Sequence, residues 1–108
     1  MEEIIYKIKA DFLRTLSHPV RLKVIEILKG GEQSVGSLVK KTGVEQSSLS
    51  RHLIALRDAG VLKSRQERTM VFYAIKDHDI FLILRPIAVM LRKKFRESEQ
   101  ILSTLGKE

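Results

Sequence analysis

The hydrophobic residues near the N-terminus recur every three or four positions across residues 3–16, a spacing that places them on one face of an amphipathic helix. They are Ile4, Ile5, Ile8, Phe12, Leu13 and Leu16. A second helical pattern begins at Pro19, because proline is tolerated in a first helical turn, and it stops at Gly30 and Gly31. The N-terminal part of the chain therefore predicts two consecutive helices.

Two more helical patterns lie close together in the middle of the chain. The spacing predicts a short helix over about residues 36–41 and a longer helix over about residues 45–59, each followed by glycine, at Gly43 and Gly60. The connection of residues 42–44 is short enough for the tight turn of a helix-turn-helix. On the longer helix, the predicted core side consists of Leu49, Leu53 and Leu56. The opposite side carries Ser47, Ser50, Arg51, Ile54 and Asp58.

The period changes from helical to alternating after Gly60. Val71, Tyr73 and Ile75 alternate with other residues beyond a polar stretch at 65–69, a pattern that predicts a β-hairpin. A helical pattern returns over about residues 77–104, with a hydrophobic stripe made of Ile80, Leu84, Ile87, Leu91 and Phe95. The predicted fold is mainly α with a β-hairpin wing, a winged helix-turn-helix of five helices, in a single domain that spans residues 1–108.

Positive charge is concentrated in the predicted helix-turn-helix and hairpin. Residues 40–76 contain 8 Lys or Arg against 3 Asp or Glu, a net charge of +5, whereas the whole chain of 108 residues carries +7. Each flank supplies only +1, so the positive potential is local. It coincides with the segment of about residues 35–75 whose elements are suited to enter a DNA groove. Double-stranded DNA is therefore the predicted partner.

The composition and the motifs exclude several other classes of protein. With no cysteine there is no disulfide and no thiolate metal site. The chain offers no nucleophile–base pair and no glycine-rich phosphate loop, so we predict that it is not an enzyme. Its N-terminus lacks a basic region followed by an apolar run, and its apolar stretches are too short to span a bilayer. We therefore expect a cytoplasmic protein without a membrane partner.

The polar side of the longer central helix supplies the candidate DNA-reading residues. Small hydroxyl side chains allow a close approach to base edges, Arg51 can reach a guanine edge or a phosphate, and Gln46 can pair with adenine or bond a phosphate. Hairpin cations can follow a phosphate backbone or enter a minor groove. The predicted DNA-binding residues are Gln46, Ser47, Ser48, Ser50, Arg51, Lys63, Arg65 and Arg68. The plainer alternatives are a solvated helix face and a hairpin charged only for solubility.

Several motifs in register give the chain a family resemblance. They are Leu16-Ser17-His18-Pro19-Val20-Arg21-Leu22, the segment of residues 46–56, and Val71-Phe72-Tyr73. Together they resemble the winged-helix repressors of the arsenic-repressor (ArsR) family over nearly the whole chain. The resemblance implies a homodimer joined by the first and last helices, about residues 2–17 and 77–104. It also implies that each subunit reads one half of an inverted-repeat operator and that the bound dimer represses transcription by occluding the promoter.

The metal sites of that family are not matched by the residues of this chain. Ser34 and Gly36 stand where the family's sensors carry a cysteine pair, and Met90 and Lys93 stand where ligands along the last helix would complete a zinc site with Asp77 and Asp79. We therefore predict no metal and no cofactor.

Asp77 and Asp79, with the intervening His78, remain the residual metal candidates, although an acidic helix start is favourable by itself. The three histidines have no ligand spacing, and His52 is expected to pack between helices or contact a phosphate. Glu45 and Glu67 replace a helix cap and a wing glycine that are common in the family. Two alternatives stay open: a metal or small-molecule sensor with an effector site in an unusual place, and a winged helix used for protein contact. The sequence leaves the effector and the operator undetermined.

Overall fold

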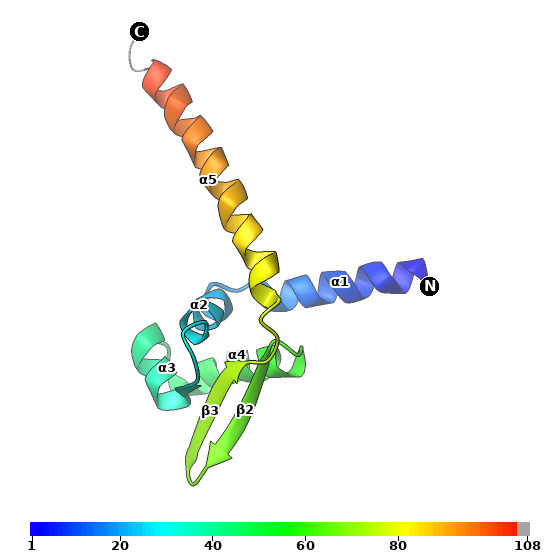
Figure 1. Cartoon of the computed structure of the whole chain (residues 1–108), viewed down its shortest axis with the longest axis vertical. Helices are drawn as coiled ribbons and strands as arrows, with labels where there is room; N and C mark the ends of the chain where they lie inside the picture. Colours follow the sequence, from blue (N-terminus) through cyan, green and yellow to red (C-terminus); the bar gives the residue numbers. More distant parts are fainter. Residues whose placement is uncertain (106–108) are drawn as a thin grey trace. The chain divides into compact units, whose positions relative to one another are not determined.

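The computed structural model describes residues 1–105, which form five helices and three strands. The helices are α1 (Glu2–Leu16), α2 (Pro19–Leu28), α3 (Val35–Thr42), α4 (Gln46–Asp58) and α5 (Ile80–Leu105). The strands are β1 (Gln33–Ser34), β2 (Leu62–Glu67) and β3 (Met70–Ile75). This element order confirms the predicted mainly α fold with a hairpin wing (Figure 1). Contacts divide the chain into two compact units, one from Met1 to Asp77 and one that begins at His78.

The tight turn between α3 and α4 is set by local chemistry. Gly43 has φ 71°, a left-handed conformation that glycine adopts without a Cβ penalty, and its N–H donates to the Val39 carbonyl at 2.8 Å. The Thr42 hydroxyl donates to the Leu38 carbonyl at 2.7 Å and accepts from the Val44 N–H at 3.2 Å. These bonds satisfy backbone groups that the end of α3 would otherwise leave unpaired. The turn therefore has a fixed geometry that orients α4.

The sheet contains one strand that the sequence analysis did not predict. Its order is β1-β3-β2, with all neighbours antiparallel. The hairpin pairs Leu62 with Ile75 at its base and Glu67 with Met70 beside its turn. On the other edge of β3, Gln33 pairs with Tyr73. The short strand β1 therefore ties the start of α3 to the hairpin.

The core of the first unit is made of aliphatic side chains from α2, α3, α4 and the base of the hairpin. Its most buried members are Val24, Ile25, Leu28, Leu38, Leu49, Leu53, Leu56, Val61 and Leu62. The predicted core side of α4 is confirmed, since its three leucines have no exposed surface. Each such side chain contributes about 1.5–3 kcal/mol relative to exposure. This packing leaves the opposite side of α4 facing solvent.

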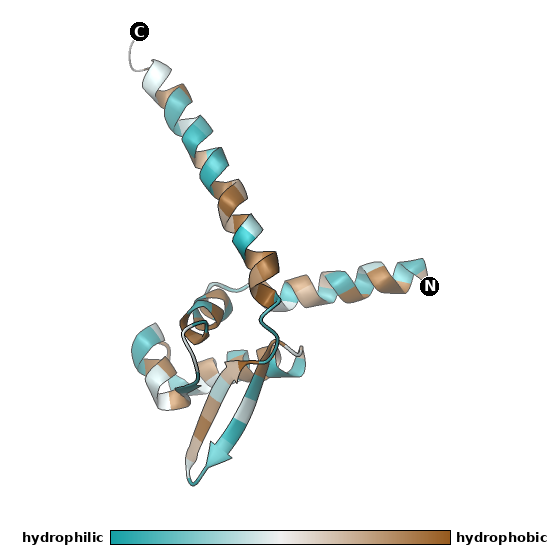
Figure 2. Cartoon of the chain, in the orientation of Figure 1, coloured by the Kyte–Doolittle hydropathy of each residue, from teal (hydrophilic) through white to brown (hydrophobic). Residues whose placement is uncertain are grey.

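Hydrophobic side chains also lie exposed on α1 and α5. On α1 they include Ile4, Ile5, Ile8 and Leu13, and on α5 they include Leu82, Ile87, Met90, Leu91, Phe95, Ile101 and Leu102. Figure 2 shows hydrophobic bands, in brown, between hydrophilic segments along both helices. None of the helices in residues 1–105 is long and apolar enough to cross a membrane. Exposed apolar surface of this extent is typical of an interaction site.

Candidate nucleic-acid interface

The exposed side of α4 presents short polar side chains and one cation. Residues four apart lie on one helix face, so Ser47 and Arg51 form a row opposite the buried leucines. Ile54 lies beside this row and is 43% exposed. Ser48 is exposed on the flank of the helix, four residues before His52. The structure thus brings Ser47 and Arg51, two of the predicted residues of α4, to one solvent-facing row, with Ser48 at its margin.

The N-terminus of α4 begins after Glu45. No side chain in the described residues caps the first backbone N–H groups of this helix. Instead the Glu45 carboxylate accepts a hydrogen bond from the Ser47 hydroxyl at 3.1 Å. Uncapped N–H groups and the helix dipole make this end of α4 locally positive. The end of the helix that carries Gln46 and Ser47 is therefore suited to an anionic partner, with Glu45 as an opposing charge.

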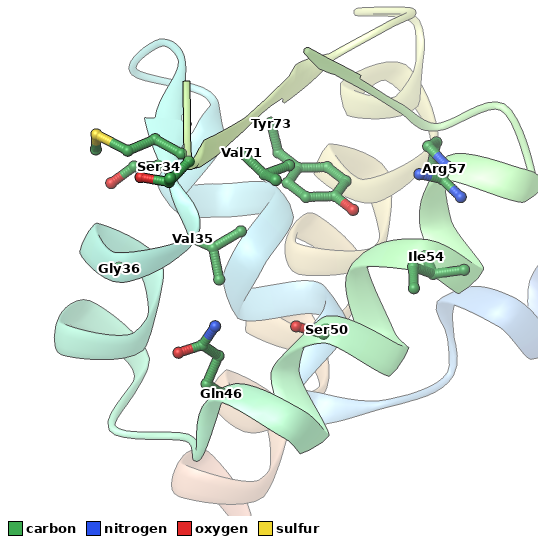
Figure 3. Close-up of a pocket in the computed structure, with 11 residues that line it drawn as sticks. Ser34, Val35, Gly36, Gln46, Ser50, Ile54, Arg57, Val71 and Tyr73 are labelled. Atoms are coloured by element: carbon green, nitrogen blue, oxygen red, sulfur yellow. The ribbon is translucent and has the colours of Figure 1, made fainter. Parts of the chain in front are cut away.

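A cleft of about 430 Å³ separates α4 from the hairpin (Figure 3). Its α4 wall consists of Gln46, Ser50, Ile54 and Arg57. Its opposite wall consists of Thr69, Met70, Val71 and Tyr73, and residues 34–36 at the start of α3 close one end. Ser50, which the sequence analysis predicts to bind DNA, therefore lines the cleft and does not belong to the exposed row formed by Ser47 and Arg51. The cleft runs between the two elements that the sequence predicts to touch DNA.

Arg65 on β2 is held by two carboxylates and a ring. Its Nε and Nη2 donate to Glu32 at 2.9 and 2.7 Å, and its Nη1 donates to Glu67 at 2.8 Å. The guanidinium carbon lies 4.4 Å from the centre of the Phe72 ring. The hydrogen bond that Glu32 accepts from Arg65 lowers the pKa of the Glu32 carboxyl, and the hydrogen bonds that Arg65 donates to Glu32 and Glu67 raise the pKa of Arg65. The positive charge of Arg65 is therefore largely offset within the subunit.

The tip of the hairpin exposes Arg68 in an unusual backbone conformation. Its φ is 57°, in the left-handed region, and no other non-glycine residue in the described chain has a positive φ. The Gln66 amide donates to the Arg68 carbonyl at 3.2 Å. The glycine-like position of the wing is thus Arg68, not Glu67 as the sequence analysis placed it. Arg68 and Lys63 are both exposed, so their cations remain available to a ligand.

A cluster of basic side chains that sequence reasoning missed joins α2 to α4. Arg21 Nε donates to His52 Nδ1 at 2.9 Å, and Arg21 Nη1 donates to the Thr15 carbonyl at 2.9 Å. The rings of His18 and His52 lie 5.6 Å apart. Burial, and then the charges of Arg21 and His18, lower the pKa of His52. Of the two roles expected for His52, this geometry favours packing between helices.

The residual metal candidates do not assemble into a ligand set. Within residues 1–105, no three side chains of His, Cys, Asp or Glu lie close enough together to hold a metal ion. This holds for Asp77, His78 and Asp79 as well. The His78 ring instead stacks on Phe81, with 6.2 Å between ring centres.

Taken together, the tight turn, the exposed polar face of α4 and the adjoining hairpin define a winged helix-turn-helix DNA-binding regulator. The family described as "Bacterial regulatory protein, arsR family" matches residues 18–64. The chain is 36% identical over 104 residues to the HTH-type transcriptional regulator Rv0081 of Mycobacterium tuberculosis, an alignment that covers 95% of this chain and 91% of that protein. The chain therefore belongs to the arsR family, which confirms the resemblance, and it is a transcriptional regulator.

Solved structures of similar proteins share the fold. The crystal structure of Rv0081 has a TM-score of 0.79 at 36% identity and covers 87% of this chain and 95% of that chain. NolR from Sinorhizobium fredii gives a TM-score of 0.76 at 29% identity, with 82% and 89% of the two chains covered. The transcriptional repressor BigR from Xylella fastidiosa gives a TM-score of 0.69 at 32% identity, with 83% of this chain and 95% of that chain covered.

Proposed function

We propose that this protein is a homodimeric repressor that binds an inverted-repeat operator in double-stranded DNA. The observation that carries the proposal is the exposed polar face of α4 beside a cationic hairpin, within a segment, residues 40–76, that carries a net charge of +5. A helix of this kind fits the major groove, and a basic hairpin beside it reaches the neighbouring backbone or minor groove. Repression follows because an occupied operator excludes the transcription machinery.

The predicted residues take different roles in this proposal. Ser47 and Arg51 point to base edges from the outer row of α4, and Gln46 acts from the N-terminal end of the helix. Ser48 reaches the sugar-phosphate backbone from the helix flank. Lys63 and Arg68 neutralise phosphates from the hairpin, whereas Arg65 chiefly holds the hairpin in place through Glu32.

The proposed dimer uses the exposed hydrophobic residues of α1 and α5. Side chains such as Ile8 on α1 and Phe95 on α5 are 62% and 61% exposed, which costs free energy in water unless a partner covers them. A two-fold dimer buries the same patch on both subunits and would present two copies of α4 to successive half-sites. A relative from Xylella fastidiosa, 41% identical over 68 residues, is named a biofilm growth-associated repressor, which supports repression as the outcome.

The experiment that tests the proposal is selection of bound duplexes from a random library, followed by affinity measurements at several salt concentrations. We expect a two-fold symmetric motif and an affinity that falls linearly on logarithmic axes, with a slope of about −0.9 per neutralised phosphate. A protein that stays monomeric and ignores duplexes at low salt would refute the proposal. Binding without steep salt dependence would favour the alternative of a winged helix used for protein contact.

A further inference from the structure

The Tyr73 side chain combines deep burial with an unpaired hydroxyl. The residue is only 4% exposed, and in residues 1–105 its hydroxyl has no hydrogen-bond partner. No polar side-chain atom of the described residues is both sealed from solvent and unpaired, so the hydroxyl must open into the cleft beside it. Figure 3 shows it directed from β3 toward α4. Because this hydroxyl opens into the cleft and has no partner within the described chain, it is available to a group that enters the cleft.

Further donors line the same cleft from both walls. In the described chain, the hydroxyls of Ser50 on α4 and Thr69 at the hairpin turn have no hydrogen-bond partner. The guanidinium of Arg57 is 43% exposed, and its Nε lies 3.6 Å from Asp58 Oδ1, too far for a strong hydrogen bond. The lining residues include no carboxylate, although Asp58 adjoins Arg57. Several hydrogen-bond donors and one cation thus line the same cleft, a set of groups that can bind an oxyanion.

We propose that this cleft seats a backbone phosphate of the bound duplex, with the Tyr73 hydroxyl and the Arg57 guanidinium donating to the phosphate oxygens. The inference rests on the proposed DNA-binding function. A protein that inserts a helix into the major groove and lays a hairpin along the next minor groove must straddle the strand between the two grooves. In this fold the space between those two elements is the cleft. Tyrosine, serine and arginine are all common phosphate donors.

The decisive variant is Tyr73→Phe, because it removes the hydroxyl and keeps the packed ring. We expect about a tenfold loss of affinity on operator and non-operator duplexes alike, as for the loss of one hydrogen bond to a charged group. The preference for the operator sequence and the midpoint of thermal unfolding should not change. Tyr6, the other tyrosine of the chain, is 68% exposed on α1, so Tyr6→Phe is a matched control that should bind like the wild type.

A second variant keeps the test decisive if Tyr73→Phe does not fold. Arg57→Gln changes an exposed side chain, and it should lower affinity for every duplex and make the salt slope shallower by about one phosphate contact.

Wild-type affinity in folded Tyr73→Phe, or an unchanged salt slope in Arg57→Gln, would overturn the inference while leaving the proposed function intact. A loss confined to one operator base would overturn it as well, since a phosphate contact carries no sequence information. A wild type that binds no duplex would overturn both proposals together.

Discussion

Arg65 and Glu32 are 33 residues apart in sequence, and they form a two-point ion pair at 2.9 and 2.7 Å that joins β2 to the residue just before β1. Arg65 lies on β2 opposite Phe72 of β3, and Ser34 of β1 lies opposite the same residue on the other edge. The pair therefore spans β3 and covers the Phe72 ring. It braces the middle of the hairpin against the segment that leads into α3.

A double-mutant cycle with Arg65→Ala and Glu32→Ala should detect this brace. The two side chains are 50% and 37% exposed, so water screens their attraction, and we expect only a small favourable coupling in the free energy of unfolding, as for other solvent-exposed ion pairs. Urea denaturation at low and high salt measures it, and the coupling should shrink as salt rises. Additive effects of the two substitutions would show that the pair does not stabilise the fold.

The same variant tests the direct DNA contact predicted for Arg65 from the sequence. If Glu32 and Glu67 already offset the charge of Arg65, Arg65→Ala should weaken DNA binding through a looser wing while the salt slope stays the same. A salt dependence of DNA affinity whose slope is shallower by about one would instead show that Arg65 neutralises a phosphate.

The fold was largely predictable because periodicity records burial. Leu49, Leu53 and Leu56 had to lie on one side of a helix, and Gly43 had to end the helix before it, so α3 and α4 were located to within about two residues, the usual uncertainty of helix ends. The last helix begins at Ile80, three residues after its predicted start. Strand β1 was not predictable. Two residues cannot show an alternating pattern, and this strand exists only because β3 offers it an edge.

The residues of the site that share one helix could be predicted from the sequence. The contacts between residues that are distant in the sequence could not. The outer row of Ser47 and Arg51 follows from helical spacing alone. The partner of Arg65 comes from the distant α2–β1 connection, and that of His52 comes from α2. The exposure of the Tyr73 hydroxyl to a cleft likewise depends on how the hairpin packs beside α4. Such contacts leave no periodic trace in the sequence.

Arg68→Gly should separate the stability of the wing from its charge. Glycine accepts the φ of 57° without a Cβ clash, so the folded state should gain up to about 1 kcal/mol, partly offset by the freer unfolded chain. DNA affinity should fall and the salt slope should become shallower by about one, because a phosphate contact is lost. Arg68→Ala is the matched control: it should lose the same affinity without gaining stability. An affinity that neither substitution lowers would exclude Arg68 from the interface.

Arg51→Ala should cost about 1–3 kcal/mol of binding free energy on the selected operator if Arg51 reads a base edge. Preference should relax at one position of each half-site. Fluorescence anisotropy with the operator and its single-base variants measures both effects. Arg14 on α1, which pairs with Asp11 at 2.8 Å, provides the control substitution Arg14→Ala. An equal, small loss on every duplex would mean that Arg51 contacts a phosphate instead.

Stability should fall as the pH falls below the usual histidine value of 6.5, because of His52. Its pKa is lowered in the folded state, so folding favours the neutral ring, whose Nδ1 accepts from Arg21. The stabilisation is complete above the unfolded-state pKa and is lost as the pH falls through the folded-state pKa. Thermal melts of the wild type and His52→Gln across this range should differ in slope, with the variant less sensitive. Equal slopes for His52→Gln and the wild type would contradict the prediction.

Leu91→Glu should dissociate the proposed dimer without unfolding the subunit. Leu91 is 46% exposed on α5, so a carboxylate there is solvated in the monomer but would be buried and unpaired in a dimer. Leu91 can bury only about half of its side chain in the dimer, so losing that burial in both subunits implies at least about a tenfold rise in the dimer dissociation constant, and the two unpaired carboxylates raise it further. Sedimentation equilibrium measures it. Gln100 lies halfway around the same helix from Leu91, so Gln100→Glu adds the same charge on the opposite side and should leave the dimer intact.

Because two linked copies of α4 bind a full operator far more tightly than one, Leu91→Glu should also lose operator affinity while keeping its affinity for a half-site. A Leu91→Glu dimer as tight as the wild type would remove α5 from the interface.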